Sequence, residues 1–281
     1  MRYGLPYQGS KSKLAERIVA LLPEAEHLYD IFAGGCAVTH CAMAQTGLFS
    51  KWRRFHANDA TDMPRLFADA MAGKYAAERR WISREDFLRL KEDDPYVRSV
   101  WSFGNKGRDY LYSRKLEPYK KALHEMLFAE TVQQRRVLYH TVIKELLPLL
   151  GKTSNKSLQV LQNLQRLERL QSLQRLERLQ SLESLGITQL DYREVQVLPD
   201  SVIYADPPYI GTTGYGKATF DHEAFYDWCE RQTAPLFISE YTMPEDRFTC
   251  IAEWGRTSSL SPTNNSLRVT ERIYRPNTQL T

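Results

Sequence analysis

The sequence predicts an α/β fold in which one sheet is interrupted by an inserted helical module. In residues 1–67, and again in residues 187–281, short apolar runs alternate with helical patterns, as in a sheet with helices on its faces. Residues 68–157 lack this alternation and are helix-rich, aromatic and heavily charged. A length of 281 residues accommodates one large α/β domain with a smaller insert.

The first α/β segment is expected to contain two helices and two strands. Helical periodicity begins near Lys13 and stops before Pro23, and a glycine turn after the first strand opens the second helix. The expected elements are a helix over residues 13–22, a strand over residues 28–32, a helix after residue 36 and a strand over residues 54–57.

The second α/β segment resumes the same alternation. We interpret His222 and Glu223 as the start of a helix and not as a catalytic dyad. The expected elements are a strand over residues 201–205, a helix near 222–232, a strand over 235–239 and a closing strand pair near 247–253 and 268–274.

A low-complexity connector, residues 158–186, separates the helical module from the second α/β segment. Leucine recurs at every third position from Leu158 to Leu185, and residues 165–173 are repeated without change as residues 174–182. Gln, Arg, Glu and Leu are good helix formers, so a helix is expected, with a short solenoid-like stack as the alternative. We assign the connector no chemistry.

Composition excludes several classes of protein. No apolar run approaches the length of a membrane span, and the N-terminus lacks the apolar core of a signal peptide. The four cysteines have no zinc-ligand spacing and no small secreted frame, so we expect reduced thiols, a cytoplasmic protein and no metal. A net charge of +4 permits nucleic-acid binding without requiring it.

The tetrapeptide Asp206-Pro207-Pro208-Tyr209 is the strongest functional signal. It follows the expected strand over residues 201–205, at the end of the strand where α/β sheets bind ligands. An exocyclic amine on an aromatic ring is a poor nucleophile, and a carboxylate with a backbone carbonyl can hold it by accepting its hydrogen bonds. The prolines stiffen the turn and remove donors, and the tyrosine offers a face to an extruded base. The tetrapeptide therefore indicates an amine-methylation clamp; the alternative is an ordinary proline-rich turn.

A glycine turn and an acidic strand end together indicate an adenosyl ligand without phosphates, and Lys11 adds a candidate contact to a carboxylate. The turn Phe32-Ala33-Gly34-Gly35 follows a strand, and paired glycines let a ligand approach the backbone, although the dinucleotide fingerprint G-x-G-x-x-G is absent. Asp59 ends the next strand, where a carboxylate can accept from ribose hydroxyls or cap the following helix. Lys11 offers a cation to a carboxylate such as that of a methionine moiety, or lies at a solvated helix start.

The order of these motifs resembles that of the Dam-type N6-adenine DNA methyltransferases in their alpha arrangement. The resemblance covers residues 1–67 and 187–275 and rests on Tyr-x-Gly-Ser-Lys, Asp-Ile-Phe-Ala-Gly-Gly, Asn-Asp and Asp-Pro-Pro-Tyr. It implies a Rossmann-like, S-adenosylmethionine-dependent methyltransferase sheet of seven strands, with Asp206, Pro207, Pro208 and Tyr209 as catalytic residues. The implied cofactor-binding residues are Tyr7 and Lys11 at the methionine end, Phe32, Ala33, Gly34 and Gly35 at the floor, Asp59 at the ribose, Asp191 and Tyr192 at the adenine, and Asp206.

By the same resemblance, residues 68–157 are the DNA target-recognition module. Residues 101–121 interleave cations, aromatics and glycine; cations can neutralise phosphates, Asn and Arg can read base edges, and aromatics can stack. The alternative is a solvated helical face with its aromatics in the core. The expected DNA-binding residues are Asn105, Lys106, Arg108, Arg114, Lys115, Lys120 and Lys121.

The implied reaction is methyl transfer from S-adenosylmethionine to the N6 amine of an adenine flipped out of duplex DNA. No cysteine follows a proline, which argues against the covalent route of C5-cytosine enzymes. A cytosine-N4 methyltransferase is an alternative, because the same clamp holds either amine; an RNA or protein-amide methyltransferase and a catalytically silent DNA-binding relative are others. Double-stranded DNA is the expected partner. A cognate restriction endonuclease stays open, with no stable complex implied.

Overall fold

A computed structural model describes residues 3–5, 9–45, 50–105, 107–146, 182–210, 220–258 and 267–280. The chain divides into two compact units. The sheet unit comprises Met1–Gly4, Ser10–Phe67 and Gln180–Thr281, and the helical unit comprises Leu5–Gly9 and Ala68–Leu179. In the described part of the chain, no helix has the length and apolar character needed to cross a membrane.

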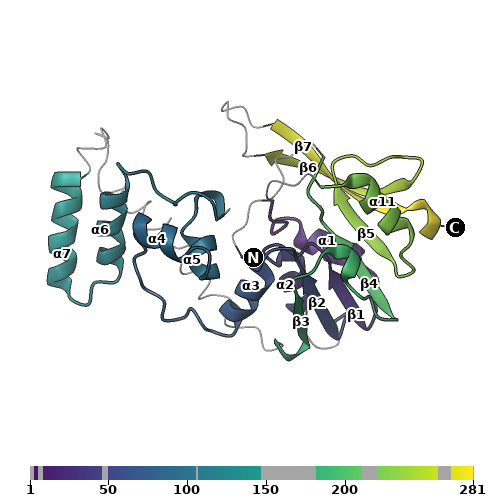
Figure 1. Cartoon of the computed structure of the whole chain (residues 1–281), viewed down its shortest axis with the longest axis horizontal. Coiled ribbons are helices and arrows are strands. Elements are labelled where there is room, and N and C mark those ends of the chain that lie inside the picture. Colours follow the sequence, from purple (N-terminus) through teal and green to yellow (C-terminus); the bar gives the residue numbers. More distant parts are fainter. Residues whose placement is uncertain are drawn as a thin grey trace. The chain divides into compact units, whose positions relative to one another are not determined.

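The sheet unit is built on seven strands in the order β3-β2-β1-β4-β5-β7-β6 (Figure 1). The first five are parallel to one another, and β7 is antiparallel to both β5 and β6. The expected Rossmann-like α/β class with a seven-stranded sheet is therefore confirmed. The strands are β1 (His27–Asp30), β2 (Arg54–Asn58), β3 (Leu185–Thr188), β4 (Ser201–Ala205), β5 (Leu236–Glu240), β6 (Phe248–Ser258) and β7 (Leu267–Pro276).

Helices cover both faces of this sheet. Side chains along a strand alternate between the two faces, so neighbouring residues such as Asp30 and Ile31 identify which helix lies on which face. Thr39 of α2 donates from Oγ1 to Asp30 Oδ2 at 2.7 Å, which puts α2 on the face of Asp30. On the opposite face Phe225 of α11 packs in a buried cluster with Ile31 and Ile203. Helix α1 packs against α2. The helices are α1 (Ala15–Leu21), α2 (Ala37–Met43), α3 (Met63–Met71) and α11 (His222–Glu230); the chain passes from the sheet unit to the helical unit within α3.

The strands expected from the sequence are found within a few residues of their expected bounds, but β3 is not among them. It begins at Leu185, inside the expected connector. The described end of the leucine repeat is a 3-10 turn, Leu182–Ser184, so the expected helix does not reach Leu185. Residues 158–181 of the repeat lie outside the described residues.

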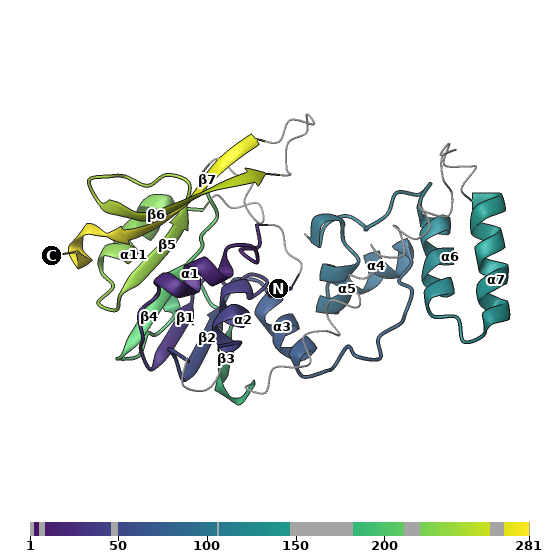
Figure 2. The same ribbon diagram turned by 180° about the vertical axis from the view of Figure 1, so that it is seen from behind.

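The helical unit consists of short helices with strong N-terminal caps. Ser83 accepts from the backbone of Asp86, and Thr131 forms a reciprocal capping box with Gln134. The last two helices lie side by side (Figures 1 and 2), and a buried cluster joins Leu123 of α6 to Val142 in the turn that follows α7. The helices are α4 (Arg84–Leu90), α5 (Pro95–Val100), α6 (Glu117–Leu127) and α7 (Val132–Thr141), followed by a π-helical turn, Val142–Leu146.

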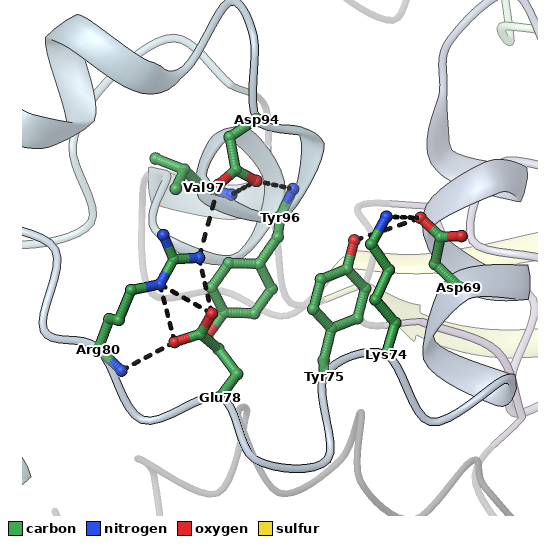
Figure 3. A network of polar contacts seen from close by, with 8 residues as sticks. All are labelled: Asp69, Lys74, Tyr75, Glu78, Arg80, Asp94, Tyr96 and Val97. Atoms are coloured by element: carbon green, nitrogen blue, oxygen red, sulfur yellow. Dashed lines mark hydrogen bonds and ion pairs between the residues drawn. The ribbon is translucent and has the colours of Figure 1, made fainter.

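A polar network ties the irregular segment between α3 and α4 to the start of α5 (Figure 3). Arg80 pairs with Glu78 at 2.6 Å and reaches Asp94 at 3.5 Å, while Asp94 caps α5. The rings of Tyr75 and Tyr96 stack with their centroids 5.0 Å apart. Ion pairing, capping and stacking thus order a stretch that has no helix or strand of its own.

Candidate active site at the carboxyl ends of the parallel strands

Two carboxylates mark the point at which the strand order of the sheet reverses. From β1 the chain adds β2 and β3 on one side and β4 and β5 on the other. In open α/β sheets, ligands bind at the carboxyl ends of the strands at such a switch point. Asp30 is the last residue of β1, and Asp206 directly follows β4. The two residues therefore occupy the position where this fold class builds its sites.

Asp206 belongs to a chain of buried charged and polar groups. Lys11 Nζ lies 2.7 Å from Asp206 Oδ1 and 3.2 Å from Glu271 Oε1. The Tyr209 hydroxyl donates to the same Glu271 oxygen, and the Lys11 ammonium lies 4.7 Å from the centroid of the Tyr209 ring. The exposed fractions are 6% for Lys11, 18% for Asp206 and 0% for Glu271, so among these three Asp206 offers most surface to a ligand.

Burial and pairing compete in setting the protonation of this cluster. Burial would lower the pKa of Lys11, but Asp206 and Glu271 outweigh it and hold that pKa above its ordinary value. Burial raises the pKa of Asp206; Lys11 opposes the shift and Glu271 adds to it. The ammonium thus stays charged, and the Asp206 carboxylate lies against it as a directed hydrogen-bond acceptor.

The proline turn is held from two sides. His222, the first residue of α11, donates from Nε2 to the Pro208 carbonyl at 3.0 Å. The Tyr209 ring meets Tyr241 edge-on, with centroids 4.5 Å apart. Burial raises the pKa of Glu240, at the end of β5, to about 8, although Glu240 accepts from the backbone of Tyr241 at 2.7 Å. His222 therefore starts a helix, as expected, and also anchors the turn.

The glycine turn after β1 adopts backbone conformations that favour glycine. Gly34 has φ +46° and donates its N–H to Asp59 Oδ2 at 2.9 Å. Gly4 packs against the same turn with φ +69°, and a Cβ on Gly4 would come within 2.4 Å of the Gly35 carbonyl oxygen. Ala33 donates its N–H to the Asn58 carbonyl at 2.8 Å. The turn is consequently a fixed backbone surface bounded by Asp59.

Asp59 closes a local turn ahead of α3 and does not cap that helix, which begins four residues later at Met63. Its Oδ1 accepts from the Thr61 backbone at 2.8 Å and from the Thr61 hydroxyl at 2.6 Å. Each carboxylate oxygen has more than one acceptor site, so a ribose contact remains chemically open to it.

Asn58 is a connection that sequence reasoning passed over. Its side-chain amide donates to Ile31 and Leu190 carbonyls, each at 3.1 Å, and its Oδ1 accepts from Thr188 Oγ1 at 2.8 Å and from the Leu190 backbone at 3.0 Å. One buried side chain therefore ties together the carboxyl ends of β1, β2 and β3. The sequence signal, an Asn at a strand end, is too common to reveal this role.

Asp30 begins the Asp-Ile-Phe-Ala-Gly-Gly motif, but sequence reasoning assigned this residue no role. It is 2% exposed, and in the described part of the chain its Oδ1 has no hydrogen-bond partner. Burial raises the pKa of Asp30 to about 7, against the hydrogen bond from Thr39. A buried acceptor of this kind suits a cationic group, because a positive charge would stabilise the ionised form.

Aromatic rings gather beside the glycine turn. Phe32, Tyr192 and Phe220 lie with centroids 5.4 to 5.8 Å apart, and Phe225 borders them. Asp191 is turned outward to Arg193 at 2.7 Å and caps the short helical turn that carries Tyr192. The expected cofactor residues Lys11, Phe32, Ala33, Gly34, Gly35, Asp59, Asp191, Tyr192 and Asp206 all belong to the sheet unit; Tyr7 lies outside the described residues.

The expected DNA-binding residues of the helical unit differ in their exposure. Arg108, Arg114 and Lys115 are exposed. Asn105 has φ +60° and donates its amide to the Ser99 carbonyl at 2.9 Å, which makes it part of a turn. The remaining positions are Lys120, half-buried over the Tyr112 and Tyr119 rings, Lys121, exposed and 3.9 Å from Glu125, and Lys106, which lies outside the described residues.

The aromatics of the same stretch correct one expectation. Trp101, Tyr110 and Tyr119 are 2%, 6% and 2% exposed and pack in the core of the helical unit, as in the alternative that the sequence left open. Phe103, in contrast, is 69% exposed. Alternating cations and aromatics do not reveal which side of the chain faces inward.

Across the described residues, no group of three or more His, Cys, Asp and Glu side chains is arranged to hold a metal ion.

Comparison with known proteins adds the family. No curated protein matches the chain. Two solved structures of the rRNA methyltransferase aviRa from Streptomyces viridochromogenes are each 12% identical and cover 95% of this chain and 84% and 83% of their own chains, with TM-scores of 0.39 and 0.37. Scores this low carry no inference about the substrate of this chain.

The model of the D12 class N6 adenine-specific DNA methyltransferases matches residues 7–234, from the first motif segment to beyond the proline turn. The family expected from the order of the motifs is thereby confirmed. With a match over most of its 281 residues, the chain belongs to the D12 class N6 adenine-specific DNA methyltransferase family.

Proposed function

We propose that this protein methylates the N6 amine of adenine in double-stranded DNA, with S-adenosylmethionine as the methyl donor. The observation that carries the proposal is Asp206. It follows β4 at the switch point of the sheet, lies 2.7 Å from the Lys11 ammonium, and begins a stiff proline turn. Family membership supplies the reaction class, and this geometry supports the proposed choice of residues.

The cofactor fits the carboxyl end of β1. S-adenosylmethionine, when bound, supplies a methyl group on a positively charged sulfur. Asp30, with an unpartnered oxygen among the described residues, would hold its positive end. Asp59 would accept from the ribose, and Phe32 with Tyr192 would border the adenine ring. We assign Lys11 to Asp206 and Glu271 instead of to the methionine carboxylate, because both protein carboxylates lie within 3.2 Å of its ammonium.

The target amine fits Asp206 and the Pro207 carbonyl. The Pro208 carbonyl accepts from His222, so we assign the second hydrogen bond of the amine to Pro207. Two acceptors aimed at one NH2 orient the nitrogen lone pair, and orientation supplies much of the rate in a transfer that needs no covalent enzyme intermediate. The amine proton becomes acidic only as the new N–C bond forms, and it leaves along the hydrogen bond to Asp206. Tyr209 would stack on the extruded adenine.

The helical unit would bind the DNA backbone. Its exposed cations Arg108, Arg114, Lys115 and Lys121 can neutralise phosphates. Helix α7 adds Arg135 and Arg136 on a helix without a buried residue, in a stretch, residues 131–144, that has no acid. Because its Gln and Arg side chains suit base edges, α7 is the element of this unit best suited to the major groove.

The direct experiment is transfer of labelled methyl groups from S-adenosylmethionine to unmethylated genomic DNA, followed by nucleoside analysis. The purified wild-type protein is compared with Asp206→Ala. We expect label in N6-methyladenine with the wild type alone. Label in N4-methylcytosine would keep the clamp and overturn the target base. Absence of labelled nucleoside from a protein that binds the cofactor would overturn the proposed reaction.

A further inference from the structure

Glu271 lies outside the part of the chain that the family model matches, yet its side chain reaches the centre of the proposed site. It belongs to β7, the yellow strand of Figure 1, and is 0% exposed. Its Oε1 lies 3.2 Å from Lys11 Nζ and accepts from the Tyr209 hydroxyl. A carboxylate that is this deeply buried requires hydrogen-bonding or charged partners. The partners of Glu271 are Lys11 and Tyr209, two residues of the proposed site.

We propose that Glu271 is a positioning residue of the methyl-transfer site, which shares the Lys11 ammonium with Asp206 and holds the hydroxyl end of Tyr209. The inference rests on the proposed function, because it assigns Glu271 a part in the reaction of Asp206. It adds a carboxylate from the far end of the sequence to a site whose recognised motif is the proline turn.

Glu271 helps to fix the position of the Lys11 ammonium. An ammonium has three donors, and Lys11 meets three partners: Asp206, Glu271 and the ring face of Tyr209. With both carboxylates present, Lys11 is fixed between them and Asp206 keeps a defined direction. Without the charge of Glu271, the full attraction of Lys11 would fall on Asp206 and compete with the incoming amine for its oxygens.

Glu271 also holds the side chain of Tyr209 in place. A tyrosine on a turn can rotate about its side-chain bonds, but here its hydroxyl is tied to Glu271 and its ring packs edge-on against Tyr241. A hydrogen bond at the far end of the ring removes most of that freedom before an adenine arrives. Glu271 therefore orients the stacking ring and the accepting carboxylate together, through one oxygen atom.

The charge of Glu271 also acts on Asp206 through space, and this provides a readout that a purely structural role would not change. The charged and titratable groups that face Asp206 are Lys11 before α1, Asp30 on β1, Tyr204 on β4, Tyr209 on the turn, Glu240 on β5 and Glu271 on β7. Glu271 raises the pKa of Asp206. Removing that charge lowers the pKa, so the acidic limb of the rate profile should move to lower pH.

The test uses Glu271→Gln and Glu271→Asp in the full-length chain, with Glu253→Gln as the matched control. Glu253 is a 63% exposed carboxylate on the neighbouring strand β6, paired with Arg272. We expect kcat to fall by roughly 10- to 100-fold in Glu271→Gln, with KM for DNA nearly unchanged and the acidic limb at lower pH. Glu271→Asp keeps the charge but shortens the reach, so kcat should fall while the acidic limb stays in place.

A second measurement does not depend on activity. Nitrogen-15 NMR of the lysine ammonium groups follows Lys11, assigned by its loss in Lys11→Arg. In Glu271→Gln its titration midpoint should fall by about one pH unit, because one of two opposite charges is gone. An unchanged midpoint overturns the proposed contact whether or not the protein methylates DNA. A lowered midpoint with wild-type kcat and pH profile overturns the positioning role. Failure of the wild type to form N6-methyladenine is read separately and overturns the proposed function.

Discussion

Lys11 in the sheet unit and Arg114 in the helical unit carry the same charge in opposite settings. Lys11 is 6% exposed and lies within 3.2 Å of two carboxylates, whereas Arg114 is exposed. A buried ammonium has one acceptable geometry, because leaving it unpaired is costly. An exposed arginine keeps its hydration and can follow a polyanion along its backbone. Under the proposed function, the two units would divide the work: fixed charges would serve the reaction, and adaptable charges would bind DNA.

Asp206→Asn should have the largest effect on this division. The amide keeps the size of the side chain but loses the charge and half of the acceptor capacity toward the amine. We expect methyl transfer to fall by roughly 100- to 1,000-fold, in the range seen when one preorganised electrostatic partner is removed. Single-turnover assays at saturating DNA measure it. A comparable loss of DNA affinity in this variant would show that the reaction and DNA binding are not divided between the two units.

Asp30→Asn tests whether the other buried carboxylate of the sheet unit awaits a cation. The folded state holds the pKa of Asp30 at about 7, above its unfolded value, so ionisation destabilises the fold as pH rises from about 4 to about 7. At about pH 8 the Asn variant should therefore be more stable by about 1 to 3 kcal/mol, after the cost of its unpaired amide. Urea unfolding measures the gain.

Binding provides the control for Asp30. The same variant should bind S-adenosylmethionine more weakly by calorimetry, since the negative partner of the cofactor is removed. A variant that gains no stability and loses no affinity would show that Asp30 is an ordinary buried acid.

The exposed side of the comparison is tested by Arg114→Ala with Lys115→Ala. Two phosphate contacts contribute about 2 to the slope of log affinity against log salt, and their loss should weaken DNA binding by roughly tenfold at moderate salt. The effect should fall on affinity and not on the rate at saturating DNA. Arg17→Ala with Arg53→Ala removes two exposed charges from the sheet unit and serves as the matched control. Equal losses in both pairs would show that only net charge matters.

The smallest effect is expected from His40→Asn. His40 on α2 accepts the Gly4 N–H through Nδ1 at 2.8 Å, and burial lowers its pKa to about 4. The unfolded chain binds this proton more tightly, so folding stability is lost as pH falls from about 6.5 towards 4. Asn keeps an acceptor at the same place without titrating. The drop in unfolding free energy between about pH 7 and pH 5 should shrink by about 1 kcal/mol, and an unshrunk drop would remove His40 from the account.

Local motifs explain how much of this molecule could be predicted from the sequence. The strand before the proline turn, Ser201–Ala205, has the expected bounds because its five residues are all buried and a breaker follows. The α/β class and the family could also be predicted, and both are confirmed. Each motif that carries them is a contiguous run of residues, and the order of the motifs along the chain is specific. Strand β3 is not predicted, since Leu185 also continues a leucine repeat whose composition favours helix.

The rest required the fold, because it depends on residues far apart in the chain. Glu271 lies in no motif, and only the pairing of β7 with β5 brings it to Lys11. Trp101 and Tyr110 are interleaved with cations, but burial and not sequence order decides that they pack inward. The roles assigned to the cofactor and DNA residues remain predictions.

The most direct test of the division between the units measures two quantities on the same two variants: DNA affinity by fluorescence anisotropy and the single-turnover methylation rate at saturating DNA. We predict that Asp206→Asn keeps wild-type affinity and loses the rate, and that Arg114→Ala with Lys115→Ala loses affinity and keeps the rate. If both variants lose both quantities in similar proportion, the buried and exposed charges do not act separately, and the account is wrong.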